Sequence, residues 1–313
     1  MMDADSHGLM RFQESYIESD GLKLLLKHHS PARPRSTVLF LHGFPDDHDT
    51  WSFQLEELGK RYTVAALEMR GVGRSDRPRP GRSYAVQNIL PDISRAIEFL
   101  GVQKVHLVGH DWGGMIGWCY ATDPELSANL LSYQGMSAPH PGTIRTYILN
   151  KLKTFGLGPL ARQLLKSWYV WYFQIPFLPE ASIRALSPSL RSGLLRKGGM
   201  DQNDPLILKS KEEFARITTG SVNLYRQLLR RTPRRPQPPK IPTQQIIPAG
   251  DLFVSTELYH GQQKLLAGPN YREIHLDGPH WIHRKDPATI NAILAEFIEE
   301  HNGGAKKSRS RKK

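Results

Sequence analysis

Cysteine is almost absent from this sequence. The 313 residues contain one, Cys119, so no disulfide can form within the chain, and cysteine usage leaves the cellular compartment open. Cys119 falls inside a helical segment, where a small buried packing role is favoured over reactivity. A chain of this length can bury a sizeable core, either as one large α/β domain or as a core with an inserted subdomain.

Long hydrophobic runs are also absent. Hydrophobic residues make up an ordinary 39% of the chain, and no apolar stretch is long enough to span a bilayer. The first five residues, Met-Met-Asp-Ala-Asp, are acidic and polar, unlike a secretory signal. We therefore expect a soluble cytoplasmic protein.

Acidic residues are outnumbered. The chain has 42 Lys and Arg against 30 Asp and Glu, a net charge of +12. Much of the excess lies at residues 230–235 and in the tail 303–313, which lacks apolar residues and is expected to be disordered. Such runs can contact nucleic acid or anionic lipid weakly. Neither is interleaved with aromatic residues, so charge alone does not predict nucleic-acid binding.

Strand-like and helix-like segments alternate through the first half of the chain. This alternation predicts a mostly parallel sheet covered on both faces, although it does not give the strand order. Ser19-Asp20-Gly21 is a hairpin turn sequence between the first two strands. We expect strands at 12–18, 22–28, 37–41, 62–67, 105–108 and 129–133, and helices at 51–58, 89–100 and from 112 to about 121.

The pattern changes at Pro139. Residues 139–239 are rich in aromatic, Leu and Arg residues with helical periodicity, and strands return only at 242–248 and 271–276, before a helix at 288–300. The return of core strands favours an inserted cap over a separate interaction domain, and such caps cover the carboxyl ends of the strands. The expected division is core 1–138, helical cap 139–239, core 240–302 and basic tail 303–313.

Serine is missing from the one position where a lipase or esterase would need it. Gly109-His110-Asp111-Trp112-Gly113 has the spacing of a nucleophile elbow between a strand and a helix, with Asp at its centre. The central residue of such an elbow sits in a strained turn that only small neighbours tolerate. An Asp nucleophile attacks carbon directly and forms an alkyl-enzyme ester, so ordinary ester hydrolysis is disfavoured.

Three further segments complete a hydrolase site. The loop His42-Gly43-Phe44-Pro45 follows the third strand, and in α/β hydrolases such a loop supplies one oxyanion-hole N–H, here Phe44, with the second from Trp112. Asp251 follows one late strand and His280 follows the next, which reproduces the chain order nucleophile, acid, histidine. His283 is the alternative histidine.

With these residues in view, the chain resembles the epoxide hydrolase branch of the α/β-hydrolase fold from about Phe12 to Ile298. The resemblance implies an eight-stranded, mostly parallel sheet with an inserted helical cap. It rests on the elbow, the His-Gly-Phe-Pro loop, the Arg-Gly-Val-Gly-Arg-Ser-Asp segment at 70–76 and the Ala-Pro-His-Pro segment at 138–141. Glu68 stands where relatives often have Asp, and we expect it to cap a turn.

The same resemblance implies two cap tyrosines that hydrogen-bond the epoxide oxygen. The aromatic segment 167–174 places the first at Tyr169, with Tyr172 as the alternative, and the segment Asn-Leu-Tyr-Arg places the second at Tyr225. One departure concerns the triad acid. The family usually has a glycine a few residues before it, whereas here Gly250 directly precedes Asp251.

The resulting hypothesis is an epoxide hydrolase that makes vicinal diols without metal or organic cofactor. Asp111, expected to stay ionised, would form the ester, and His280 with Asp251 would activate the water that hydrolyses it. Aromatic residues of the cap (Trp168, Trp171, Phe173, Phe177) suggest an apolar or aryl epoxide as substrate. The oligomeric state is expected to be monomer or homodimer.

Two other functions remain as alternatives. A haloalkane-type dehalogenase would use the same Asp nucleophile, but Phe44 has no side-chain donor for a halide and the tyrosine pair favours an epoxide. Fluoroacetate dehalogenases carry Arg at the position of Trp112. A non-catalytic binder of the same fold is disfavoured by the complete set of site residues. A nucleic-acid-associated protein using the basic tail would show salt-sensitive DNA binding that is lost on deleting the residues after Gly304.

Overall fold

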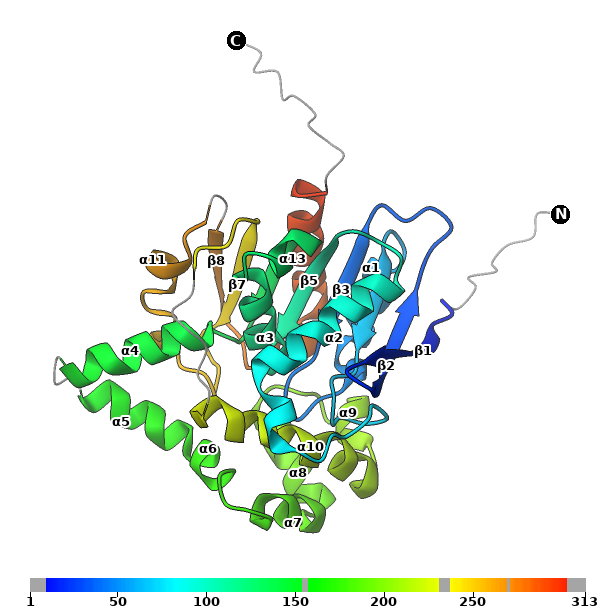
Figure 1. Cartoon of the computed structure of the whole chain (residues 1–313). Coiled ribbons are helices and arrows are strands. Elements are labelled where there is room, and N and C mark those ends of the chain that lie inside the picture. The colour runs from blue at the N-terminus through cyan, green and yellow to red at the C-terminus, as the bar shows by residue number, and fades with distance from the viewer. Residues whose placement is uncertain (1–9, 154–156, 231–236, 269–270, 303–313) are drawn as a thin grey trace.

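Eight strands form one twisted sheet with helices on both faces (Figure 1). The computed structural model describes residues 10–153, 157–230, 237–268 and 271–302. The acidic N-terminal residues, most of the basic cluster at 230–235 and the tail 303–313 lie outside the described residues. The strands are β1 (Gln13–Ser19), β2 (Leu22–His29), β3 (Thr37–Leu41), β4 (Thr63–Leu67), β5 (Val105–His110), β6 (Leu130–Met136), β7 (Thr243–Pro248) and β8 (Tyr271–Leu276).

The order of the strands is β1-β2-β4-β3-β5-β6-β7-β8. The β1–β2 and β2–β4 pairs are antiparallel and the remaining pairs are parallel, so the predicted mostly parallel sheet is confirmed. The predicted hairpin turn is present, with positive φ at Asp20 and Gly21.

Two strands are longer than their apolar runs suggested. β5 continues through Gly109 to His110, and β6 continues past Tyr133 through Gln134 to Met136. The added residues pair with each other and with β7, so backbone pairing extends strands whose side chains there are not apolar. One helix begins three residues before its expected start, at Val86.

Each face of the sheet is covered by its own pair of helices. α2 (Val86–Phe99) and α3 (Trp112–Ala121) pack on one face, and α1 (Ser52–Leu58) and α13 (Pro287–Glu300) pack on the other. Both faces of the central strands are buried, which explains why β3 reads as a continuous apolar run.

The other helices of the sheet region are α11 (Gln262–Leu266), α12 (Ile282–Lys285) and the 3-10 turns η1 (His48–Trp51), η2 (Gly81–Tyr84), η3 (Leu126–Asn129) and η4 (Thr256–Tyr259).

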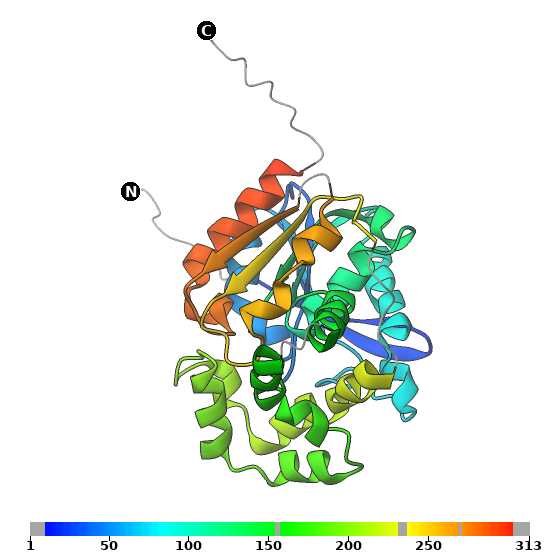
Figure 2. The ribbon, with the colours of Figure 1, turned by 90° about the vertical axis from the view of Figure 1, so that its left-hand side faces the viewer.

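All helices between β6 and β7 gather beyond one end of the sheet (Figures 1 and 2). We call this stretch the helical segment. It comprises α4 (Pro141–Lys153), α5 (Leu157–Lys166), α6 (Trp168–Tyr172), α7 (Leu178–Ala185), α8 (Pro188–Lys197), α9 (Pro205–Leu208) and α10 (Lys211–Arg230). Its aromatic side chains contact Phe44 and Trp112, which follow β3 and β5. The segment therefore lies over the carboxyl ends of the parallel strands. Among the described residues, no helix combines the length and apolar character needed to cross a membrane.

Candidate active site

Asp111 occupies a strained turn between β5 and α3. Its φ is +49° and its ψ is −119°, a conformation that L-residues rarely adopt. Asp111 is the residue that directly precedes α3, and its side chain makes no capping hydrogen bond to that helix. The turn therefore aims the side chain outward from the end of the sheet.

The glycines around Asp111 are required by close backbone approach. A Cβ on Gly113 would lie 2.2 Å from the carbonyl oxygen of Leu41, and one on Gly109 would lie 2.4 Å from that of Gly113. The prediction that only small neighbours fit this turn is confirmed at both positions.

Two backbone N–H groups converge on the Asp111 carboxylate. Phe44 N donates to Oδ1 over 2.8 Å, and the N–H of Trp112 also bonds this side chain. Phe44 belongs to the loop after β3, which is adjacent to β5 in the sheet, so sheet order brings the two donors together. The structure thus brings the N–H groups of Phe44 and Trp112 together at the Asp111 carboxylate.

His280 and Asp251 form a buried pair beside Asp111. His280 Nδ1 lies 2.7 Å from Asp251 Oδ2, and His280 Nε2 lies 3.8 Å from Asp111 Oδ2. The other oxygen of Asp251 accepts N–H bonds from Phe253 and Val254, which fix the carboxylate despite the altered glycine spacing. This contact pattern leaves Nε2 of His280 directed at Asp111.

The alternative histidine, His283, faces away from this pair. Its Nε2 bonds the hydroxyl of Thr50 over 2.9 Å, and its ring packs on Trp51. Burial holds the pKa of His283 well below its usual range. The geometry therefore favours His280.

Tyr169 and Tyr225 come together over Asp111 from two helices of the helical segment. Tyr225 packs edge-on against Phe44 and Trp112, with ring centroids 5.2 and 5.0 Å apart, and Tyr169 lies 5.7 Å from Tyr225. The Trp112 indole N–H bonds the Tyr225 hydroxyl. The alternative, Tyr172, instead bonds Ser182 of α7.

Burial dominates the electrostatics of the site. It raises the pKa of Tyr169 and of Tyr225, and the Asp111 carboxylate adds to both shifts, so both phenols stay protonated. Burial lowers the pKa of His280, but the charges of Asp251 and Asp111 outweigh it and the net shift is upward.

The pKa of Asp111 is raised above the ordinary value of an aspartate. Burial raises it, while the charge of His280 and the N–H groups of Phe44 and Trp112 oppose that shift. The expectation that Asp111 stays ionised left out the desolvation that comes with a covered site, which acts against the ionised form. The ionised form of Asp111 therefore depends on these partners.

Three of the aromatic residues expected near a substrate point to solvent instead. Trp168, Trp171 and Phe177 are 63%, 54% and 85% exposed. Only Phe173 of that group is buried, and it packs against Phe44 and Tyr225. Aromatic content identified the segment but could not tell its inner from its outer face.

Asp46 is a buried acid that the sequence analysis did not single out. Its Oδ2 accepts from Trp281 Nε1 at 2.8 Å and from the hydroxyl of Thr50 at 3.1 Å. Burial raises its pKa to about 7. Its charge contributes to the raised pKa of His280. Its place directly after the His-Gly-Phe-Pro loop was the available signal.

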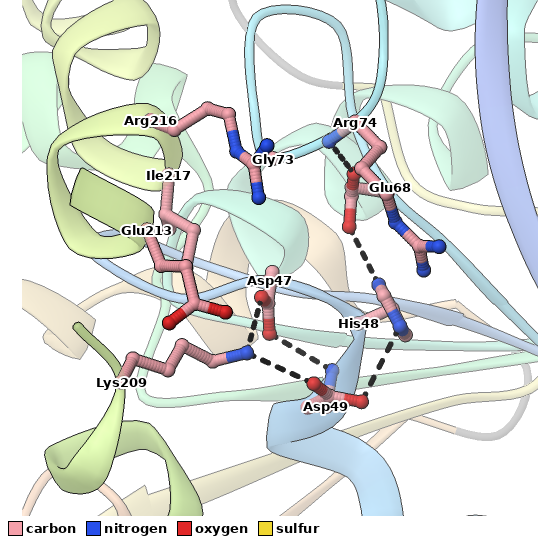
Figure 3. A pocket seen from close by; sticks show the side chains of 10 residues that line it. All are labelled: Asp47, His48, Asp49, Glu68, Gly73, Arg74, Lys209, Glu213, Arg216 and Ile217. Carbon is pink, nitrogen blue, oxygen red and sulfur yellow. Dashed lines mark hydrogen bonds and ion pairs between the residues drawn. The ribbon is translucent and has the colours of Figure 1, made fainter.

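A second acidic cluster lies on the outer side of the same loop (Figure 3). Asp47, His48 and Glu68 line a pocket of about 270 Å³, and their ligand atoms lie within 4.8 Å of one another. His48 Nδ1 bonds Glu68, while Lys209 Nζ lies 2.9 Å from Asp47 and 2.9 Å from Asp49. The ammonium of Lys209 therefore compensates the charge of Asp47 and Asp49.

Glu68 also performs the role expected of it. One of its carboxylate oxygens accepts the N–H groups of Arg74 and Ser75, in the turn that follows β4. The prediction that Glu68 caps a turn is confirmed.

Comparisons with known proteins agree with this architecture. The family model of the alpha/beta hydrolase fold matches residues 36–156. Epoxide hydrolase 3 of Xenopus tropicalis is 29% identical over 305 residues, 94% of this chain and 78% of the relative. AB hydrolase superfamily protein YfhM of Bacillus subtilis is 30% identical over 299 residues, 91% of this chain and 97% of the relative.

Solved structures give the same result. An epoxide hydrolase of Bacillus megaterium in complex with an inhibitor aligns with a TM-score of 0.74 and 24% identity, covering 91% of this chain and all of that one (100%). A variant of an epoxide hydrolase from that organism, complexed with its product (R)-3-[1]naphthyloxy-propane-1,2-diol, aligns at 0.73 with 25% identity over 91% and 100% of the two chains. The chain belongs to the α/β-hydrolase superfamily, and its relatives over most of its length include epoxide hydrolases.

Proposed function

We propose that this protein is an epoxide hydrolase, converting an epoxide and water to a vicinal diol through an ester on Asp111. The observation that carries the proposal is the pairing of an Asp nucleophile with two phenols held over it, buried Tyr225 and partly buried Tyr169. Its support includes the similarity to Epoxide hydrolase 3 and to a Bacillus megaterium enzyme whose structure holds a diol product.

The first step opens the epoxide. Tyr169 and Tyr225 donate O–H bonds to the epoxide oxygen, and Asp111 Oδ2 attacks a ring carbon from the opposite side. The C–O bond breaks, and the alkoxide takes a proton from one phenol. Trp112 donates its indole N–H to the Tyr225 oxygen, so the proton of that phenol remains free for substrate.

The second step hydrolyses the ester. Neutral His280 removes a proton from water, which attacks the carbonyl carbon of the Asp111 ester. The resulting oxyanion is held by the N–H groups of Phe44 and Trp112, and such donors contribute roughly 3 kcal/mol each. Collapse breaks the C–O bond of the ester. The departing alkoxide takes the remaining proton of the attacking water, which restores the Asp111 carboxylate and releases the diol, and the proton on His280 returns to the ionised phenol. No step requires a metal or organic cofactor.

Tyr169 and Tyr225 both come from the helical segment, which we therefore assign as the cap, with the boundaries 139–239 predicted from the sequence. Phe173, which packs against both Phe44 and Tyr225, supports an apolar or aryl epoxide. The expected location in the cytoplasm and the state of monomer or homodimer stay predictions.

Trapping the ester tests the proposal. His280→Gln should accumulate a covalent adduct with an aryl epoxide such as styrene oxide, seen by intact mass spectrometry as the full mass of the epoxide. The additional change Asp111→Asn should abolish the adduct. Tyr225→Phe should slow adduct formation by about 100-fold, whereas Tyr172→Phe is the matched control and should not.

The opposite outcome would identify the alternative reaction. If no epoxide gives an adduct with His280→Gln but an alkyl halide does, with loss of halide, the enzyme is a dehalogenase and the proposal is wrong.

A further inference from the structure

The helical segment has an exposed apolar face on its outer side, which we call the outer face. Its three aromatic members, Trp168, Trp171 and Phe177, are more than half exposed. α5, α6 and α7 follow one another along the rim of the molecule away from the sheet (Figure 1). The outer face consists of Leu165, Trp168, Trp171, Ile175, Phe177 and Leu178.

Exposed and inward-facing residues alternate through this stretch. Leu165 lies near the end of α5, Trp168 and Trp171 lie in α6 and Ile175 follows α6, and all four are exposed. Tyr169 and Phe173, which are four residues apart, lie on the inner side against Tyr225. The exposed residues therefore do not contribute to the packing around Tyr225, which Tyr169 and Phe173 already provide.

The outer face is comparable in size with the largest apolar patch of a typical monomer, which is often functional. At 150–250 Å² per aromatic side chain, its three aromatics alone expose roughly 400 Å², which is within the range of the largest patch on a typical monomer. Phe177 also has a φ of +64°, a costly conformation for a bulky residue. Because the Phe177 side chain is 85% exposed, this backbone strain is not offset by packing of that side chain in the core.

The helical segment that carries this face is strongly positive as a whole. Between residues 141 and 230 the chain has fourteen Lys and Arg and five Asp and Glu, a net +9 of the total +12. One of the five acids, Glu180 at the start of α7, is neutralised by two bonds from Arg226. Exposed Lys166 adjoins Leu165 and Trp168 in the chain.

A basic pocket lies at the other end of α7. It has a volume of about 470 Å³ and is lined by Arg77, Arg184, Lys211 and Arg216, with Glu212 as its acid. Arg184 follows Leu178 by six residues, a rise of roughly 9 Å along the helix. An anionic group bound there would be within about one Debye length of the outer face.

We propose that the outer face docks on an anionic phospholipid membrane surface. Trp168, Trp171 and Phe177 enter the interface at headgroup level, where amphipathic aromatic rings are favoured. Lys166 and the basic pocket contact lipid phosphates. A second copy of the chain fits this face poorly, because it would bring one strongly positive segment against another. The proposal concerns binding and does not depend on which reaction the enzyme catalyses.

Sedimentation with vesicles tests the proposal. The full-length protein should co-sediment with vesicles of phosphatidylcholine mixed with phosphatidylglycerol, and far less with phosphatidylcholine alone. The triple variant Trp168→Ser, Trp171→Ser, Phe177→Ser should lose at least tenfold in affinity. The matched control is Leu190→Ser with Leu194→Ser, two exposed leucines of α8, which should bind as the parent does.

A separate set of variants tests the contribution of charge to vesicle binding. Lys166→Gln, Arg184→Gln and Lys211→Gln should each weaken binding to the mixed vesicles by roughly fivefold at low salt. Far-UV circular dichroism of each variant should match the parent, which separates loss of docking from loss of fold.

Three results would overturn the proposal. One is the absence of binding to either vesicle by the parent protein. Another is binding that the triple aromatic variant leaves unchanged. The last is a dimer in light scattering that the triple variant dissociates without any vesicle binding, which would show that a second copy covers this face.

Discussion

The turn that holds Asp111 can form only because Gly113 has no Cβ. Asp111 keeps its positive φ only because Gly113 lets α3 approach the end of β3, where a Cβ has no room beside the Leu41 carbonyl. Because the obstacle is backbone rather than a flexible side chain, the strand and helix would have to separate.

Gly113→Ala should therefore destabilise the protein by about 2 to 4 kcal/mol. Urea unfolding measures this change. The control is Gly193→Ala, an exposed glycine within α8 whose Cβ would meet nothing within 4 Å. That change should be neutral or stabilise by up to about 1 kcal/mol, because alanine favours the helix. Equal effects at both positions would contradict the steric account.

The charge of Asp251 should set the pH at which ester hydrolysis begins. His280 acts as a base only when neutral, so the rate falls as pH drops through its pKa, which Asp251 raises above the usual 6.5. Asp251→Asn should move this acid limb to lower pH and reduce the plateau rate by roughly 10²- to 10⁴-fold.

Single-turnover decay of the Asp111 ester, measured across pH in proteins that keep His280, gives the limb directly. Asp49→Asn serves as the control, since Asp49 lies outside the groups that shift His280. An acid limb that stays in place in Asp251→Asn would argue against the assigned role of Asp251.

At the scale of elements, one loop carries two functions on its two sides. The segment between β3 and α1 presents Phe44 N–H to Asp111 and, a few residues later, Asp47 and Asp49 to Lys209 between α9 and α10 (Figure 3). The helical segment is thus ion-paired to the same loop that supplies the oxyanion donor. A change in this contact should affect both stability and the site.

Lys209→Met should destabilise the protein by about 1 to 3 kcal/mol, because it leaves the buried Asp47 carboxylate without its ammonium partner. Thermal and urea unfolding measure the loss. Lys60→Met provides the comparison, since Lys60 and Glu57 form an exposed pair that should contribute less than about 1 kcal/mol. Similar losses in both variants would show that burial of this contact is unimportant.

His48 should make that loop more stable at mildly acidic pH than at alkaline pH. Burial lowers its pKa, but the bond to Glu68 and the charges of Asp49 and Asp47 outweigh burial, so the net shift is upward. The stabilisation is complete below the ordinary value of 6.5 and is lost as pH rises through the raised pKa.

The measurement is the difference in free energy of unfolding between the parent and His48→Gln. It should be larger at about pH 6 than at about pH 9. A difference that is constant, or that grows with pH, would contradict the assignment of a charged His48–Glu68 pair.

For the whole molecule, the distribution of charge matters more than its total. The tail 303–313 has six basic and no acidic residues, whereas the helical segment accounts for a net +9. The two sources of positive charge can therefore be separated by truncation.

Removal of residues 303–313 should leave epoxide turnover unchanged and preserve binding to mixed anionic vesicles within about threefold, because the helical segment keeps its charge. Any weak, salt-sensitive binding to DNA should fall in the truncated protein. Turnover and vesicle sedimentation of the two forms measure both effects. Loss of vesicle binding on truncation would place the lipid contact in the tail.

Local patterns determined much of this protein in advance. Apolar periodicity located the strands and helices, and glycines at fixed spacing identified the turn that holds Asp111. These predictions succeed because they depend on neighbours in the chain: side-chain alternation, helical repeat and backbone room at a turn. The order of Asp111, Asp251 and His280 along the chain was readable for the same reason.

The tertiary structure decided which side of each element faces the site. The sequence showed an aromatic helical stretch, but only packing directs Tyr169 inward to Tyr225 and leaves Trp168 and Phe177 in solvent. Burial of Asp46 and the raised pKa of Asp111 also depend on residues distant in sequence. Periodicity gives a helix two faces, while desolvation and contact with other elements determine what each face does.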